Sequence, residues 1–292
     1  MKKTIISLLV ITLCLSAAAQ IDSSRVTPQD DTIRIGTMII LKKGNPDDHT
    51  SDQITLGRFH TRKRSKFKTS SFVLDIGFSN WVDKTDYSAA VADNYLVSRP
   101  GQGTLNSSDF NLRTIKSVNI NLWFFMQRLS LINHYLNLVY GLGLELNNYR
   151  FQSPVSLHKS GFNPYNTGQF IDHPFILQDS VGFRKNKLAA DYLTIPLMLD
   201  LSSNAHSDYK GIRLSAGVSV GYLYSNRNKQ ISAARGMQKI RGDLGLQSWK
   251  FSYIAEVGLG PVHLYGSYSP QSIFTKGLQF KPYTVGLRFS NW

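Results

Sequence analysis

The stretch from Leu188 to Leu201 constrains the fold more than any other part of the chain, because its side chains alternate in character. From residue 193 to residue 201 every second residue is Leu or Ile, whereas the residues between them are mixed. A period of two indicates a β-strand with one wholly apolar face. The stretch is also long enough to cross a bilayer, which takes about 9–11 tilted residues of strand.

The same alternation recurs in seven more segments of the chain. They are residues 71–81, 115–127, 135–149, 210–224, 247–258, 261–269 and 279–291. Long connections are expected after the first, third and fifth strands, at 82–114, 150–187 and 225–246. Short ones are expected between them, at 128–134, 202–209 and 259–260, and a last loop at 270–278.

Long loops that alternate with short turns are typical of an outer-membrane barrel, whereas a soluble β-sandwich has no reason to show them. The sequence therefore predicts an all-β fold. The predicted fold is an eight-stranded antiparallel transmembrane up-and-down β-barrel over residues 70–292, with a short N-terminal periplasmic segment.

Two further features refine this prediction. A mid-strand proline donates no ladder hydrogen bond, so we expect Pro196 at a bulge or at an unpaired position. Aromatic residues near strand ends are expected at the membrane–water boundaries. These aromatic residues are Trp81, Trp123, Tyr149, Phe151, Tyr192, Tyr222, Tyr224, Trp249 and Trp292.

The N-terminal residues have the pattern of a secretory signal peptide, which we place at 1–19. Lys2 and Lys3 precede an apolar run and a stretch of small residues that ends at Ala19. An uncleaved anchor is the alternative. Cys14 is the only cysteine, and the large Leu13 before it disfavours lipid attachment. The processed chain would have no disulfides.

Residues 20–69 form a polar and basic leader that is expected in the periplasm. Its last part carries a basic run just before the first strand of the barrel. This run is either a solvated tail or a contact with lipid phosphates at the periplasmic rim. The residues of this periplasmic-rim run are Arg58, Arg62, Lys63, Arg64, Lys66 and Lys68.

The chain has a formal net charge of +14, two units of which belong to the lysines of the signal peptide. A basic balance favours acidic partners. For an exported protein these are outer-membrane lipids and anionic glycolipid, with envelope or secretion proteins as further candidates and no nucleic acid.

Three segments carry a resemblance to a known family. They are Tyr192-Leu193-Thr194-Ile195-Pro196-Leu197-Met198-Leu199, the glycine-punctuated stretch from Gly211 to Tyr222, and the closing Tyr283-Thr284-Val285-Gly286-Leu287-Arg288-Phe289. With these the chain, over roughly 70–292, resembles the PorT-like family of small outer-membrane β-barrels. The resemblance implies the fold and an outer-membrane location, but it implies no single activity.

The inward faces of the predicted strands carry charged residues of both signs. An eight-stranded barrel is only wide enough to be filled by side chains, so we expect ion pairs rather than an open pore. A substrate or ion path along these groups is the alternative. The members of this interior polar cluster are Asp75, Glu145, Asp200, Arg213, Lys250, Glu256 and Arg288.

No catalytic, cofactor-binding or metal-binding residue can be assigned. His263 and Ser267 lie on one predicted face with Glu256 on the neighbouring strand, which leaves open a membrane-embedded hydrolase. The alternative is an interior histidine with a structural role. His158, Asp172 and His173 share one loop, but their spacing is not that of a metal site.

The outer loops are the expected functional surface, because loops on a rigid scaffold carry recognition. The loop at 225–246 holds a basic patch, which is either a collar around glycolipid or a site for a partner. We expect a non-enzymatic barrel with a structural or accessory role in envelope assembly, protein export or surface binding. A lipid- or peptide-hydrolysing barrel and a small-solute channel remain alternatives. The basic patch comprises Arg227, Lys229, Arg235, Lys239 and Arg241.

Overall fold

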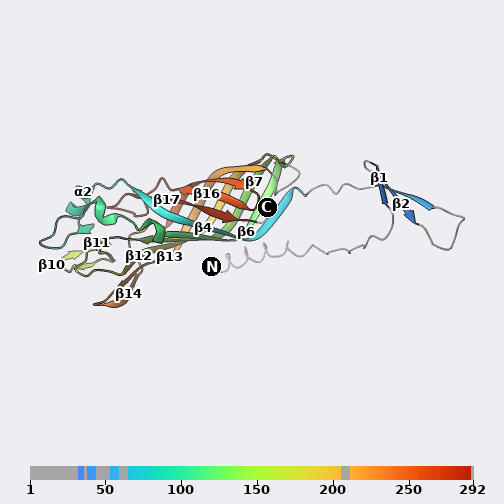
Figure 1. Ribbon diagram of the computed structural model, residues 1–292. Coiled ribbons are helices and arrows are strands. Elements are labelled where there is room, and N and C mark those ends of the chain that lie inside the picture. Colours follow the sequence, from blue (N-terminus) through green and yellow to red (C-terminus); the bar gives the residue numbers. More distant parts are fainter. Residues whose placement is uncertain (1–31, 36–37, 44–52, 59–64, 205–210, 291–292) are drawn as a thin grey trace, which may run out of the picture. The chain divides into compact units, whose positions relative to one another are not determined.

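The computed structural model describes residues 32–35, 38–43, 53–58, 65–204 and 211–290 (Figure 1). The chain divides into two compact units, Met1–Arg64 and Ser65–Trp292. In the first, β1 (Thr32–Ile35), β2 (Met38–Lys43) and β3 (Gln53–Arg58) form an antiparallel sheet. The predicted signal peptide at 1–19 and Trp292 lie outside the described residues.

Eight strands of the second unit form a closed antiparallel ring. Each strand pairs with its neighbours in sequence, and the last strand pairs with the first, from Phe280↔Asp83 to Phe289↔Leu74. The predicted eight-stranded up-and-down barrel is therefore confirmed. Its strands are β4 (Phe67–Asp83), β6 (Val118–Ile132), β7 (Leu136–Arg150), β12 (Lys185–Ser202), β13 (Ile212–Ser232), β15 (Trp249–Leu259), β16 (Val262–Tyr268) and β17 (Phe280–Phe289).

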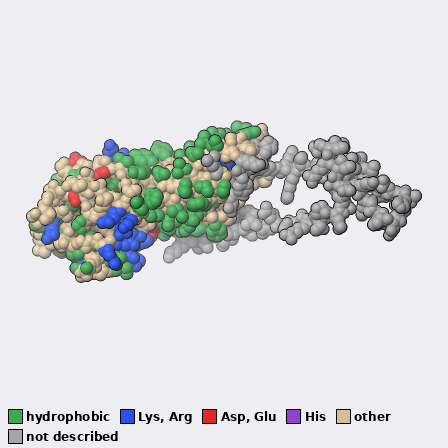
Figure 2. Space-filling model, in the orientation of Figure 1, with side chains coloured by type: hydrophobic (Ala, Val, Ile, Leu, Met, Phe, Trp, Pro, Cys, Tyr) green, Lys and Arg blue, Asp and Glu red, His purple; other side chains and the backbone are tan. Residues whose placement is uncertain are grey.

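The alternation in the sequence places apolar side chains on the outside of the ring. On β12 the even positions from Tyr192 to Ser202 are mostly buried, whereas Leu193, Ile195, Leu197, Leu199 and Leu201 are 40–56% exposed. The other strands repeat this pattern, and Figure 2 shows apolar side chains covering the middle of the barrel. A continuous apolar surface of this size is the signature of contact with lipid.

Pro196 lies where the β12 ladder is interrupted. It pairs with Ser219 of β13, but the register between β12 and β7 passes from Thr194↔Gly143 to Leu197↔Tyr140 without it. The missing N–H therefore costs no ladder bond on the β7 side, as the sequence predicts.

The ends of two strands differ from the prediction. β12 begins at Lys185, and β13 continues to Ser232 and turns back as β14 (Gly236–Arg241). Most of the expected loop at 225–246 is therefore a hairpin that extends one wall of the barrel. In this extension polar residues alternate between the inward and outward faces, as the residues of the lipid-facing part of β13 do. The strand pairing therefore continues beyond the apolar surface.

The two ends of the barrel are built differently. Short turns at 133–135 and 260–261 define the short-turn end, where β12 also ends at Ser202 and β13 begins at Ile212. The segments 84–117, 151–184, 233–248 and 269–279 form a folded cap at the other, capped end. The cap contains α2 (Tyr87–Ala92), β5 (Leu96–Val97), η1 (Ser107–Phe110), η2 (Thr114–Lys116), β8 (Val155–His158), β9 (Gly161–Asn163), β10 (Asn166–Ile171) and β11 (Phe175–Gln178).

The cap has its own hydrophobic core, which continues into the mouth of the barrel. Trp81 stacks on Phe280 at 4.8 Å between ring centroids and also contacts Tyr149 and Phe151. Cap residues such as Phe110, Leu157, Ile176 and Phe274 belong to the same buried cluster. Among the described residues, no helix is long and apolar enough to cross a membrane.

The structure corrects the prediction for five of the aromatic residues, four of which belong to this core and one, Trp123, to a separate cluster inside the barrel. Trp81, Trp123, Tyr149, Phe151 and Tyr192 are buried, whereas Tyr222, Tyr224 and Trp249 are exposed. Four of the buried five occupy inward-facing strand positions. Their closeness to a strand end therefore does not place them at the lipid boundary.

Candidate functional site

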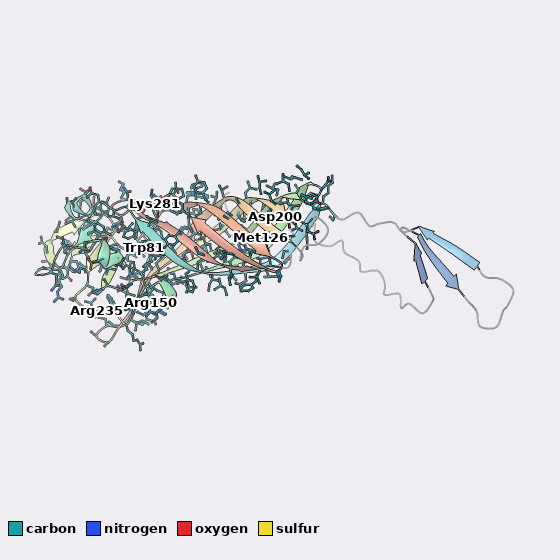
Figure 3. The ribbon with its side chains drawn as sticks, turned by 45° about the horizontal axis from the view of Figure 1, so that its top comes forward. Trp81, Met126, Arg150, Asp200, Arg235 and Lys281 are labelled. Atoms are coloured by element: carbon teal, nitrogen blue, oxygen red, sulfur yellow. The ribbon has the colours of Figure 1, made fainter. Side chains whose placement is uncertain are left out.

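The structure places all seven residues of the predicted interior polar cluster inside the barrel, where they are buried. They form groups at different depths rather than one continuous line. Figure 3 shows Asp200 and Met126 toward the short-turn end and Trp81 toward the capped end. The seven residues are Asp75, Glu145, Asp200, Arg213, Lys250, Glu256 and Arg288.

Arg288 of β17 is the centre of the first group. Its guanidinium donates from Nε and Nη2 to the two carboxylate oxygens of Asp75 at 2.7 Å each, and from Nη1 to Glu256. Asp75 also accepts from Trp123 Nε1 at 2.7 Å and from Asn121 Nδ2 at 3.0 Å. Buried charges need hydrogen-bonded partners. Here Arg288 and its two carboxylates have them, through the bidentate pair with Asp75, the bond to Glu256 and the neutral donors Trp123 and Asn121.

The second group crosses the lumen. Lys250 on β15 donates to Glu145 on β7, which lies three strands away in the ring. Asn147 Nδ2 also donates to Glu145, at 3.0 Å. On the neighbouring strands, Tyr265 of β16 donates to Asn119 of β6. Bonds that join opposite walls occupy the space that a pore would need.

Toward the short-turn end, close to Arg213 at the start of β13, lies Asp200. It accepts from Ser215 Oγ at 2.9 Å and from Asn137 Nδ2 at 3.0 Å. Asp200 and Arg213 line one small cavity together with Glu256 and Arg288 of the first group. Apolar side chains of Met126, Val139 and Met198 complete its lining.

Of the three residues of the hydrolase alternative, His263 and Glu256 come together, but Ser267 does not join them. Ser267 and His263 lie on one strand four residues apart, which is about 13 Å at the rise of a β-strand. His263 Nδ1 lies 3.5 Å from Glu256 Oε2, and its Nε2 lies 3.2 Å from the carbonyl oxygen of Gly260. His263 is buried and lines the barrel interior beside Glu256 and Arg288.

The histidines of the cap also have structural contacts. His158 stacks on Phe175 at 5.2 Å, and the ring nitrogens of His173 each lie 3.1 Å from a backbone carbonyl oxygen. Across the described ranges, no three His, Cys, Asp or Glu side chains gather closely enough to hold a metal ion.

Arg235 occupies a different position from the rest of the predicted basic patch. It lies in the turn between β13 and β14 and donates to Asp179 at 2.9 Å. Burial raises the pKa of Asp179, but hydrogen bonds from Ser156 and the Val181 amide, together with Arg235, outweigh it and lower the pKa. Arg235 therefore fastens the hairpin to the cap.

The other four residues of the patch, Arg227, Lys229, Lys239 and Arg241, share the outward face of β13 and β14. The structure adds Arg150, Lys185 and Lys187 from β7 and β12, which sequence reasoning missed. The sequence could have indicated them, because on each strand they continue the alternate positions whose apolar residues face outward. We call the seven residues the basic lattice; they are Arg150, Lys185, Lys187, Arg227, Lys229, Lys239 and Arg241.

The predicted periplasmic-rim run is divided between the two units. Arg58 ends β3, whereas Lys66 precedes β4 and Lys68 lies within it. β4 thus begins at Phe67, slightly before the expected boundary. Arg62, Lys63 and Arg64 lie outside the described residues.

Comparison with known proteins identifies the family. Residues 100–279, more than half of the chain, match the family model described as "Outer membrane protein beta-barrel domain". The chain belongs to this family. It is therefore an outer-membrane β-barrel protein of bacteria, and the narrower PorT-like resemblance stays a prediction.

Solved outer-membrane structures match this β-barrel protein weakly. The attachment invasion locus protein Ail of Yersinia pestis is 11% identical, with 76% of this chain and 97% of Ail covered and a TM-score of 0.30. Its complex with the heparin analogue sucrose octasulfate has a TM-score of 0.31 at the same identity and coverage. A porin triple mutant of Rhodopseudomonas blastica is 11% identical over 77% of this chain and 99% of the porin, with a TM-score of 0.16. No curated protein matches the chain.

Proposed function

We propose that this outer-membrane protein is non-enzymatic and acts through its outer surface, as a binding protein or as an accessory in envelope assembly or protein export. The closed capped end carries the proposal. Beneath the cap, Trp81, Tyr149 and Phe280 form a buried aromatic layer over the polar interior. A solute path would have to pass both this layer and the bonds that cross the lumen.

In this proposal the capped end faces the cell exterior, and the short-turn end and the N-terminus face the periplasm. Long outer loops and short periplasmic turns are the rule in bacterial barrels, which supports this orientation.

The cap displays an aromatic pair suited to recognition. Phe162 of β9 and Phe170 of β10 are 65% and 59% exposed, and their rings meet edge to face at 5.2 Å. Figure 1 shows β10 at the tip of the cap. Exposed rings on a rigid scaffold favour a protein partner, such as an envelope or secretion protein.

Affinity capture from detergent-solubilised outer membrane tests this role. The native chain is compared with Phe162→Ser/Phe170→Ser and with the control Ile115→Ser, which also changes an exposed cap residue. We expect an envelope protein to be recovered with the native chain and the control but to be lost with the double variant. Equal recovery by all three chains would contradict the proposal.

Two measurements address the alternatives. A steady open current in planar bilayers would support a channel, whereas we expect none. Turnover of lipid or peptide that disappears in His263→Ala/Ser267→Ala would support an enzyme, whereas we expect no turnover that depends on these residues.

A further inference from the structure

Four cationic side chains lie in one row across four neighbouring strands. Arg150 on β7 pairs with Lys187 on β12, Lys187 with Lys229 on β13, and Lys229 with Lys239 on β14. The next row of the same face pairs Arg227 with Arg241. Figure 2 shows Lys and Arg side chains gathered beside the apolar surface, toward the capped end.

This arrangement is electrostatically unfavourable without an external anion. Side chains directly opposite in a sheet lie about 4.5–5.5 Å apart at Cβ, and like charges there repel. Within the described chain one carboxylate compensates the lattice: Asp191, whose Oδ2 accepts from Arg227 Nη1 at 2.8 Å. Lys187 Nζ instead donates to the neutral Asn148 Oδ1 at 2.5 Å. The nearby Asp243 accepts from the amide of Gly245.

The position of the lattice indicates which kind of anion could reach it. On β13 the exposed Tyr222 and Tyr224 end the lipid-facing surface, and Trp249 of β15 meets Tyr222 edge to face at 5.1 Å. Such rings mark the boundary between hydrocarbon and headgroups. Arg227 follows three residues later, about 10 Å along the strand or about 7 Å along the membrane normal at a tilt near 45°. That is the depth of the lipid phosphates, since headgroups add roughly 5–8 Å to each side of the bilayer core.

We propose that the basic lattice binds the phosphate groups of lipid headgroups in the leaflet that faces the capped end. Arginine binds phosphate oxygens through two parallel N–H bonds, and lysine contributes a mobile point charge. The lattice offers both kinds of donor on a flat face that continues the lipid-facing wall. The inference rests on the proposed outer-surface role, and it adds the ligand class and the residues.

Native mass spectrometry of the full chain in neutral maltoside micelles tests the inference. The probe is dioleoyl phosphatidylglycerol, with dioleoyl phosphatidylcholine as the lipid without net charge. Lys187→Gln/Lys229→Gln removes two lattice charges. Lys84→Gln/Lys281→Gln is the matched control. These lysines lie at the capped end of β4 and β17, as the lattice does on its own strands, but on the wall of the ring opposite the lattice. Heat-modified gel mobility verifies that each variant folds.

We expect retained phosphatidylglycerol to fall about 10–30-fold in the lattice variant, since one lysine near an anionic surface is worth roughly fivefold in affinity. The control should retain as much as the native chain. Equal retention by the two double variants would overturn the inference. Displacement of the lipid by inorganic phosphate or by decaglutamate at equal charge would also overturn it, in favour of a soluble anion or an acidic peptide. The lattice variants leave Phe162 and Phe170 intact, so they should recover the protein partner as the native chain does. Failure of the lipid inference can therefore be told apart from failure of the proposed function.

Discussion

Arg288 binds two buried carboxylates at once, so its removal leaves both without their counter-charge. Loss of one partner from a buried ion pair typically costs about 3–5 kcal/mol. We therefore expect Arg288→Met to lower the free energy of unfolding by that amount, measured by urea titration in micelles. Lys281→Met, on the outward face of the same strand, is the control and should change it by less than about 0.5 kcal/mol. Equal effects of the two substitutions would show that the interior network has no role in stability.

His158 makes the cap sensitive to pH. Burial lowers its pKa below the ordinary 6.5, with Asp179 opposing and Arg235 adding to the shift. The folded cap therefore binds this proton less readily than the unfolded chain does, and stability that is complete above pH 6.5 is lost as the pH falls below it. The lowered pKa of Asp179 acts at more acidic pH, below 3.8.

Hydrogen exchange of the β8 and β11 amides at pH 7.5 and pH 5.5, corrected for intrinsic rates, measures this effect. We expect more frequent opening at pH 5.5 in the native chain. His158→Phe keeps a ring against Phe175 and should show no such change between the two pH values. If the variant opens with pH as the native chain does, His158 is not the responsible group.

At the scale of elements, the hairpin of β13 and β14 is attached to the cap at its turn by the Arg235–Asp179 ion pair and on β13 by Gln230, which donates to Ser156 Oγ at 2.7 Å. Asp179 is buried and Arg235 is partly exposed, at 3% and 39% of their side-chain areas. We expect Arg235→Ala to increase hydrogen exchange across Gly236–Arg241 severalfold and to leave β15 unchanged. Lys239→Ala on the same hairpin is the control and should not increase exchange. Unchanged protection in Arg235→Ala would mean that the hairpin does not need this ion pair.

The eight strands could be predicted because each has an apolar face that must meet lipid. The extension of β13 to Ser232 was missed, because beyond Tyr224 the outward residues are charged rather than apolar. The cap was missed for another reason. Its core is assembled from short runs such as those around Leu96, Phe110 and Ile176, which show no regular period and meet only in the folded chain.

At the scale of the whole molecule, sequence reasoning assigned the interior charges to the inward face but could not pair them. The partners of Glu145 and Asn119 lie on the far wall of the ring, at separations of 105 and 146 residues. The basic lattice was only half predicted. Its rows join strands that lie far apart in sequence, and only the register shows that Arg150 and Lys187 continue the row of Lys229.

The barrel fold depends on closure of the ring between β4 and β17. Ser79 Oγ and Thr284 Oγ1 face each other across this seam at 3.2 Å inside the barrel. Cysteines at both positions, in a Cys14→Ser background, would bring two sulfur atoms within reach of a bond. The control pairs Ser79→Cys with Ser215→Cys on β13, which lies opposite β4 in the ring.

Each variant is folded, oxidised and then denatured by heating, and its gel mobility is compared with and without reductant. We expect a reducible cross-link, seen as faster migration, for the Ser79→Cys/Thr284→Cys pair and none for the control. A folded barrel in which the seam pair stays uncross-linked would contradict the closed ring.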